Sequence, residues 1–372
     1  MAGIYIHIPF CKTRCIYCDF FSITEKAFID SLVDAECKEV ELRSHETNEP
    51  IETIYFGGGT PSFIHPQYIE KLLTVIFAHF NVVSNPEITI EVNPDDISKE
   101  KVKQYVLLGI NRISVGIQSL NESLLKFLSR RHNVPQAIRA VEKIYEAGIN
   151  NISIDVMYGI PGLSEGVWAQ TLKTVVHLPV QHISAYHLSI EKNTPINILV
   201  KNHQIKLVSE QQSIKQYEIL CKLLNDSGFQ HYEISNFAKS GYTSKHNASY
   251  WNGTEYTGIG PSAHSYNKSI RRWNVSSVEK YIYQIHSNHQ YFEQERLGIT
   301  ELFNEYLLTR LRTSAGGNLE DLRLISQEKF TMWQSKFMKE VSAGNVINDD
   351  NHFYIPEEKW LITDYILKNL FV

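Results

Sequence analysis

With 372 residues, the chain is longer than one hydrophobic core usually serves, so we expect one large domain with a smaller appendage, or two domains. Hydrophobic residues make up 43% of the chain and charged residues 21%, and the net charge of −5 leaves no basic excess that would attract nucleic acid. No basic stretch followed by a long apolar run opens the sequence, and no other apolar run approaches the roughly 20 residues that span a bilayer. We therefore expect a cytoplasmic protein without an integral membrane segment.

Short β-rich segments alternate with longer segments of helical periodicity, which is typical of βα units around a parallel sheet. Six strands are expected, at 4–8, 51–56, 87–92, 111–117, 151–157 and 182–188. Helices are expected between and after them, at 27–42, 66–80, 99–108, 135–147, 167–177 and 209–224. Because six units are fewer than the eight of a closed (β/α)8 barrel, the sequence predicts an α/β fold with a partial barrel, open at one side.

The pattern changes in the last third of the chain. A stretch rich in Tyr, Trp, Asn and Gly at 236–274 predicts irregular loops and short strands. Helical patterns dominate from Val278 to Leu311, and a Gly316-Gly317 turn precedes short helical and hairpin-like segments. We expect a smaller, mainly helical C-terminal domain that begins near residue 290.

Three of the five cysteines, Cys11, Cys15 and Cys18, crowd together directly after the first expected strand. An odd total with this spacing does not fit a disulfide framework, whereas clustered thiolates in reducing surroundings are common metal ligands. A [4Fe–4S] cluster normally takes four Cys ligands, and Cys37 lies apart in a helical segment. The loop therefore predicts a cluster with one iron open to an exogenous ligand.

Two other interpretations of these cysteines are simpler. A zinc site could form from the same three cysteines with nearby His7 as the fourth ligand, although zinc ligands usually come as two separated pairs. Three buried free cysteines fit less well, because Lys12, Arg14 and Asp19 make the segment polar.

The CxxxCxxC spacing after a first strand resembles the signature of the radical S-adenosylmethionine (SAM) enzymes. The longer stretch Tyr5-Ile6-His7-Ile8-Pro9-Phe10-Cys11 narrows the resemblance to the family of the oxygen-independent coproporphyrinogen III dehydrogenase HemN and the heme chaperone HemW. The resemblance covers essentially the whole chain. It implies a radical SAM core at 1–235, a HemW-type extension at 236–290 and a C-terminal domain at 291–372, with a [4Fe–4S] cluster whose free iron chelates SAM.

Several residues match the family's pattern for contacts to SAM. Gly57-Gly58-Gly59-Thr60-Pro61 resembles its SAM-binding GGGTP, although alone it would indicate only a tight strand-to-helix turn. Arg130 has a guanidinium suited to the SAM carboxylate, with Arg131 as the alternative. Taken singly, each polar residue would more often be a solvated or structural one, so the prediction rests on their convergence. The matching residues are Tyr5, Tyr17, Gly58, Gly59, Thr60, Glu91, Gln118, Arg130 and Asp155.

Two features distinguish the members of the family. Phe20 stands where HemN-type dehydrogenases carry a fourth cysteine, and 245–251 contains the HNxxYW motif of the heme chaperones. A His imidazole is a natural axial ligand of heme iron, and aromatic rings offer flat faces to a porphyrin. The resemblance thus makes His246, Tyr250 and Trp251 candidates for a heme site. A packed core histidine is the simpler interpretation, and His187, His231 and His264 are alternative ligands.

Our leading hypothesis is a chaperone that binds a [4Fe–4S] cluster, SAM and heme and delivers heme to acceptor proteins of the respiratory chain. It would need an electron donor to the cluster, could form a homodimer, and could associate with the membrane through its acceptor. The alternative is a radical SAM dehydrogenase that oxidatively decarboxylates coproporphyrinogen III. A zinc-stabilised interaction protein is the third possibility and predicts no affinity for SAM.

Overall fold

The structure is a computed structural model that describes all 372 residues. Its frame is one mixed sheet of 12 strands in the order β12-β11-β10-β9-β1-β2-β3-β4-β5-β6-β8-β7. The six expected strands are confirmed and pair in parallel, as β1 to β6: Ala2–Ile8, Ile51–Gly58, Val82–Val92, Arg112–Gln118, Asn151–Tyr158 and His182–His187. Most of their residues are buried, as expected for strands with both faces covered.

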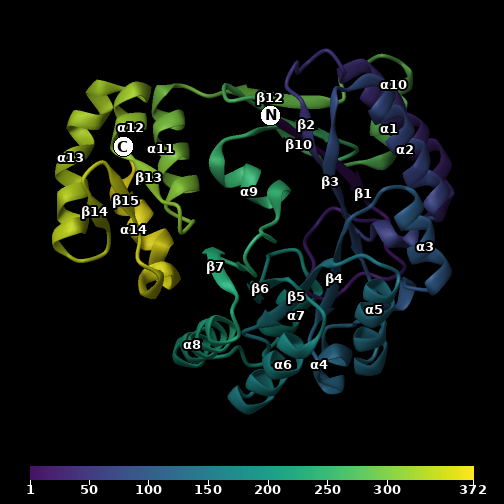
Figure 1. The fold of residues 1–372 in the computed structure, drawn as a ribbon, viewed down its shortest axis with the longest axis horizontal. Helices are drawn as coiled ribbons and strands as arrows, with labels where there is room; N and C mark the ends of the chain where they lie inside the picture. The colour runs from purple at the N-terminus through teal and green to yellow at the C-terminus, as the bar shows by residue number, and fades with distance from the viewer.

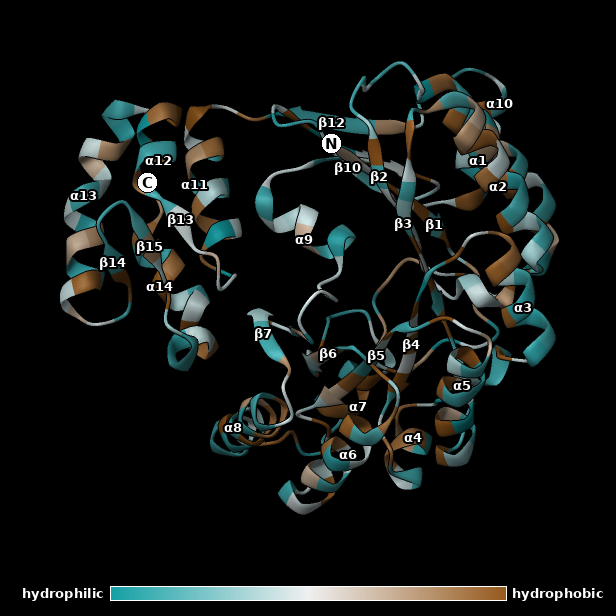
Figure 2. Ribbon diagram, viewed as in Figure 1, coloured by the Kyte–Doolittle hydropathy of each residue, from teal (hydrophilic) through white to brown (hydrophobic).

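Helices connect these strands and lie along the outside of the sheet (Figure 1). They are α1 to α8: Ile29–Arg43, Pro66–His79, Lys99–Leu107, Glu122–Phe127, Val134–Glu146, Glu165–His177, Pro195–Lys201 and Glu210–Asp226. Polar side chains such as Asn133 and Ser209 accept hydrogen bonds from the first turn and fix where α5 and α8 begin. Figure 2 shows brown and teal segments alternating along the helices, as in amphipathic helices that pack one face on a core.

The sheet is open, because its order has two free ends. Beyond β6, the strands β8 (Asn236–Ala238) and β7 (Gln230–Glu233) pair antiparallel. Beyond β1, the strand β9 (Glu255–Ile259) pairs in parallel, and three antiparallel strands extend the sheet. These are β10 (His264–Tyr266), β11 (Ile270–Asn274) and β12 (Phe292–Arg296). The expected partial barrel, open at one side, is confirmed.

Two segments differ from the expected local structure. The stretch expected to be loops and short strands contains a helix, α9 (Lys245–Asn252), whose N-terminal Ser244 accepts a hydrogen bond from Asn247. After α10 (Val278–His286), the strand β12 lies in a stretch expected to be helical. Four of its five residues are exposed, so its hydrophobic pattern carries little information, and its backbone pairing with β11 decides its conformation.

The C-terminal part forms a separate lobe, drawn in yellow and light green in Figure 1. Its helices are α11 to α14, Ile299–Arg310, Leu319–Ile325, Gln327–Ser342 and Thr363–Leu370, with a short 3-10 helix η4 at Glu357–Ile362. A three-stranded sheet of β13 (Gly317–Asn318), β15 (His352–Tyr354) and β14 (Ile347–Asp349) completes it. None of the helices of the chain combines the length and the apolar character that crossing a membrane requires.

Two separate hydrophobic cores underlie this division. The large core extends from Ala2 to Tyr291, and the second, of 15 buried residues, from Phe303 to Leu370 around Trp333. Helix α9 contacts β1 and β2 on one side and α11 on the other, so it lies between the two parts (Figure 1). The boundary near residue 290 and the division into three parts stay predictions.

Candidate functional site

A cavity of about 410 Å³ opens at the carboxyl ends of the parallel strands. Such ends meet at one edge of a sheet, where α/β proteins place their ligands. The cavity brings together most of the residues that the sequence predicted for the cluster and SAM: Cys11, Cys15, Cys18, Tyr17, Gly58, Gly59, Thr60, Glu91, Gln118, Arg130 and Asp155. Tyr5, His246, Tyr250 and Trp251 are not among its lining residues.

The cysteine loop is closed at its base. The amide of Cys11 donates to the carbonyl of Ile23 and the amide of Ile23 donates to the carbonyl of Pro9, both at 2.8 Å. Burial raises the pKa of the Cys11 thiol and raises that of Cys18 to about 11, because desolvation of the thiolates outweighs the opposing charges of Arg131 and Arg14. A bound metal cluster would displace these protons, so three thiols held at one cavity wall fit a Cys-ligated cluster.

His7 does not join the cysteines in the cavity. Its side chain is buried, its Nε2 lies 2.9 Å from the carbonyl oxygen of Phe21, and its Nδ1 lies 3.2 Å from the hydroxyl of Tyr5. Both ring nitrogens therefore have protein partners, so His7 is not free to act as the fourth ligand of a three-cysteine zinc site.

The glycines after β2 are required by close packing. A Cβ on Gly59 would lie 2.7 Å from the carbonyl carbon of Pro9, and one on Gly58, whose φ is +111°, would meet the His7 ring at 2.8 Å. Side-chain-free backbone thus lets the end of β2 approach the segment that leads into Cys11. The same glycines line the cavity. A tight turn after β2 is therefore compatible with close approach of a ligand to this backbone.

Arg130 occupies the position between the cysteine loop and the strands. One guanidinium nitrogen lies 3.5 Å from Sγ of Cys15, and another donates to the carbonyl of Gly116 at 2.5 Å and to Asn93. Its Nε is buried without a partner. Arg131, the alternative, forms ion pairs with Asp95 and Asp96 at 2.9 and 3.2 Å. Arg130 forms no ion pair, so it is the arginine whose charge is available to an anionic ligand.

Two half-buried carboxylic acids face the cavity. Burial, and then the proximity of Asp155, raises the pKa of Glu91 to about 7, while burial raises the pKa of Asp155. Glu91 accepts a hydrogen bond from the hydroxyl of Tyr55 at 2.8 Å, and Asp155 accepts one from Ser114 at 3.2 Å. Such acids can accept hydrogen bonds from hydroxyl or ammonium groups of a ligand.

Gln118 has a strained backbone, with φ of 65° in a non-glycine residue, and the register of β4 against β5 shifts between Gly116 and Gln118. Bulges and positive φ values of this kind occur at functional sites, where they redirect a side chain. Ser114, Gly116 and Gln118 alternate along β4 and all line the cavity.

The aromatic residues expected at the SAM site separate into two places. Tyr17 lines the cavity beside the cysteines, whereas Tyr5 stacks on Tyr55 and His246 with ring centroids 6.1 and 6.4 Å apart. Tyr5 therefore packs behind the cavity wall.

The HNxxYW segment forms α9, and its histidine is buried. His246 is 1% exposed, its Nδ1 lies 2.8 Å from the hydroxyl of Thr53, and its Nε2 lies 2.9 Å from the hydroxyl of Tyr250. Burial, with a smaller effect of Arg112, lowers the pKa of His246 to about 3, so the ring is neutral. In this conformation neither ring nitrogen is free to bind iron.

His187 is the only histidine that lines the cavity, at the end of β6, where its Nε2 lies 3.0 Å from the hydroxyl of Ser213. His264 is exposed and stacks on Trp273, and His231 packs elsewhere, near the C-terminal lobe.

Sequence reasoning missed several supporting residues. Tyr55 bonds Glu91, Asn93 donates to Thr60 at 3.0 Å, and Ser114 bonds Asp155. Side chains alternate between the two faces of a strand, and this pattern could have predicted Ser114. Ser114 stands two residues before Gly116 and four before Gln118, so it lies on the same face. The contacts of Tyr55 and Asn93 join segments that are far apart in the chain, and no local pattern encodes them.

Comparison with known proteins agrees with this geometry. The radical SAM superfamily model matches residues 5–175. The chain is 37% identical to the heme chaperone HemW of Lactococcus lactis over 75% of this chain and 73% of that protein, and 35% identical to HemW of Bacillus subtilis over 85% and 84%. The solved structure of Escherichia coli coproporphyrinogen III oxidase HemN superposes with a TM-score of 0.84, covering 100% of this chain and 90% of that one, at 20% identity.

The likeness to HemN concerns the fold, because the identity is low. The likeness to the HemW proteins extends through most of both sequences. This chain therefore belongs to the HemW family of heme chaperones, within the radical SAM superfamily.

Proposed function

We propose that this protein holds a [4Fe–4S] cluster on Cys11, Cys15 and Cys18, binds SAM in the adjoining cavity, binds heme, and passes heme to acceptor proteins. One observation supports the proposal above the others: three cysteines, an arginine with an unpartnered Nε and two half-buried acids line a single cavity at the strand ends. Membership in the HemW family supports heme as the cargo.

The roles of the lining residues follow from their chemistry. The guanidinium of Arg130 lies where it can pair with the carboxylate of SAM, and Glu91 and Asp155 can accept hydrogen bonds from its ribose or ammonium group. Thr60 lies 3.5 Å from Sγ of Cys11 and orients that ligand. When bound and reduced, the cluster supplies the electron that cleaves the sulfonium of SAM.

Phe20 favours a chaperone over a dehydrogenase. It stands where the dehydrogenases carry a fourth cysteine, lines the cavity, and is 66% exposed. Its ring cannot bind a metal, and it offers an apolar face at the cavity for a flat, hydrophobic ligand.

The heme site remains a proposal with two candidate histidines. His246, with Tyr250 and Trp251, fits a role in shaping the wall behind the cavity, since ligation would require its bonds to Thr53 and Tyr250 to break. His187 lines the cavity and needs to release only Ser213. The same proposal includes an electron donor to the cluster and respiratory proteins as heme acceptors. It also includes a homodimer and a cytoplasmic location, with membrane association through the acceptor.

A heme titration of the cluster-loaded protein tests the cargo. We expect the wild type to bind one heme per chain with a shift of the Soret band. If His187 is the axial ligand, His187→Ala should lose this shift. His246→Ala should bind heme more weakly, with the same spectrum as the wild type. Heme binding that is unchanged in both variants would exclude both assignments.

An assay with coproporphyrinogen III, SAM and a reductant tests the alternative function, a dehydrogenase. Catalytic formation of protoporphyrinogen would refute the chaperone function.

Iron and sulfide analysis tests the cluster. Cys11→Ala, Cys15→Ala and Cys18→Ala should each lose most of the iron and sulfide, whereas Cys37→Ala should retain them, because Cys37 lies in α1 and does not line the cavity. A full cluster in all three loop variants would refute the ligand assignment.

A further inference from the structure

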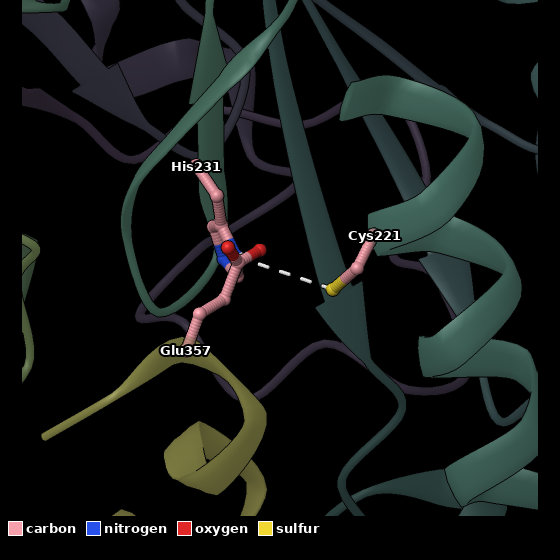
Figure 3. A group of neighbouring side chains, drawn as sticks. All are labelled: Cys221, His231 and Glu357. Atoms are coloured by element: carbon pink, nitrogen blue, oxygen red, sulfur yellow. Dashed lines mark hydrogen bonds and ion pairs between the residues drawn. The ribbon is translucent and has the colours of Figure 1, made fainter. Parts of the chain in front are cut away.

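Three potential metal ligands converge away from the cavity, where the C-terminal lobe meets the large domain. Cys221 comes from α8, His231 from β7 and Glu357 from η4, and Figure 3 shows their functional groups pointing toward one another. One ligand atom from each residue lies within 4.8 Å of the other two. The three residues are separated by up to 136 positions in the chain, so only the tertiary fold brings them together.

The imidazole of His231 stands at the centre of this group. Its Nδ1 lies 2.9 Å from Oε1 of Glu357 and 4.0 Å from Sγ of Cys221. Its Nε2 lies 3.4 Å from the carbonyl oxygen of Ile234. Metal-binding histidines commonly offer one ring nitrogen to the metal while the other donates to a backbone carbonyl, and His231 has this arrangement.

The surroundings hold the imidazole in place. It stacks on Phe237 with ring centroids 3.9 Å apart and meets the Trp360 ring edge-on at 4.3 Å. Asn225 donates to Glu357 at 3.4 Å. The hydroxyl of Tyr217 is buried beside the Cys221 thiol.

We propose that Cys221, His231 and Glu357 bind one divalent transition metal ion of the Zn²⁺ type, with water in the fourth position. A thiolate, an imidazole and a carboxylate form the mixed sulfur, nitrogen and oxygen set that suits zinc, and three protein ligands plus water is its usual open coordination. On binding, the Cys221 thiol loses its proton to solvent and the sulfur bonds the metal. None of the three residues lines the cavity, so the site is independent of the cluster and of heme.

Metal binding here would join the two parts of the molecule. Cys221 and His231 belong to elements of the large domain, and Glu357 belongs to the lobe built on the second core. The metal would therefore fix the lobe against α8 and β7. The hydrogen bond of His231 with Glu357 already joins the two parts, and the metal would add a bond to Cys221 of α8.

The test is a Co²⁺ titration of the full-length protein with its cluster already loaded, so that the loop cysteines are occupied. We expect one further Co²⁺ per chain with thiolate-to-cobalt absorption, displaced by Zn²⁺, and a higher unfolding temperature of the lobe with Zn²⁺. Cys221→Ser should abolish the thiolate band, and Glu357→Gln should weaken binding at least tenfold.

Two matched controls should bind as the wild type does. Cys37→Ser removes a cysteine outside the group, and Glu358→Gln alters the exposed neighbour of Glu357. Glu357 is partly exposed, so its variant is expected to fold even if a change at buried His231 does not. Wild-type protein that takes up no additional Co²⁺, or uptake unchanged in both Cys221→Ser and Glu357→Gln, would overturn the site and leave only the ion pair.

Discussion

Glu91 shows how its surroundings set the chemistry of one residue. Tyr55 donates to it, Asp155, Tyr5 and Arg112 act on it electrostatically, and burial raises its pKa from 4.5 to about 7. Because the folded state retains a proton that the unfolded state loses, this group's contribution to stability decreases as pH rises from about 4.5 to about 7. A cationic ligand beside Glu91 would favour the ionised form and reverse that shift.

We therefore predict that SAM binding to the cluster-loaded protein releases a proton near pH 6, and releases much less at pH 8, where Glu91 is already ionised. Calorimetric titration in two buffers of different ionisation enthalpy measures this release. Glu91→Gln should bind SAM more weakly and without the Glu91 component of the release. Equal proton release by the variant and the wild type would show that another group titrates.

At the scale of elements, the ends of β1 and β2 determine where the cysteine loop lies. The amide of Gly59 donates to the carbonyl of Ile8 at 2.9 Å, which leaves no room for a side chain next to Pro9. Helix α9 is fixed in a comparable way, since the amides of Lys245 and His246 donate to the carboxylate of Glu87 at 3.2 and 3.1 Å. An acceptor at a helix N-terminus stabilises the helix and sets its position.

Gly59→Ala is predicted to lower the free energy of unfolding by about 1–3 kcal/mol, because its Cβ meets rigid backbone, and to reduce the iron bound by the cysteine loop. Chemical denaturation and iron analysis measure the two effects. The matched control is Gly166→Ala in α6, where a Cβ meets nothing within 4 Å, and it should raise stability by roughly 0.5–1 kcal/mol. If Gly59→Ala retained both wild-type stability and iron, the close approach would not position the loop.

At the scale of the whole molecule, the chain has two hydrophobic cores with the α9 helix between them. The cavity belongs entirely to the large part, since its lining residues lie between Cys11 and Ser189. The lobe therefore contributes no residue to the cavity. It contacts the large part through α9, through the hydrogen bond of Glu357 with His231, and through backbone hydrogen bonds that Ile234 and Ser314 form across the boundary.

Trp333→Ala should destabilise the lobe by about 3–5 kcal/mol, because Trp333 is fully buried in the second core. Cluster content and SAM affinity should stay at wild-type values, since the large core is intact. Limited proteolysis should cut first within the lobe, and Met332→Ala, at a residue that is 60% exposed, should behave as the wild type does. Loss of the cluster together with the lobe would contradict two independently folded cores.

Local sequence alone was sufficient to predict the βα core and to recognise the cysteine motif. Strands such as Ile51–Gly58 and Asn151–Tyr158 carry runs of β-branched and aromatic residues that end in turn residues, and their positions follow from those runs. The cysteine spacing is a local pattern too. Because parallel strands end at one edge of their sheet, the order of these elements already implied that Glu91, Gln118 and Asp155 would meet.

Only the tertiary structure decided how distant residues combine. It buried His246 between Tyr5, Tyr55 and Thr53, paired Phe292–Arg296 as an edge strand, and joined Cys221 and His231 to Glu357. Each of these outcomes depends on contacts between segments far apart in the chain, whose free energies no local periodicity records. The sequence by itself therefore determined the family and the cysteine motif, and the packing of distant segments decided which side chains surround the loop.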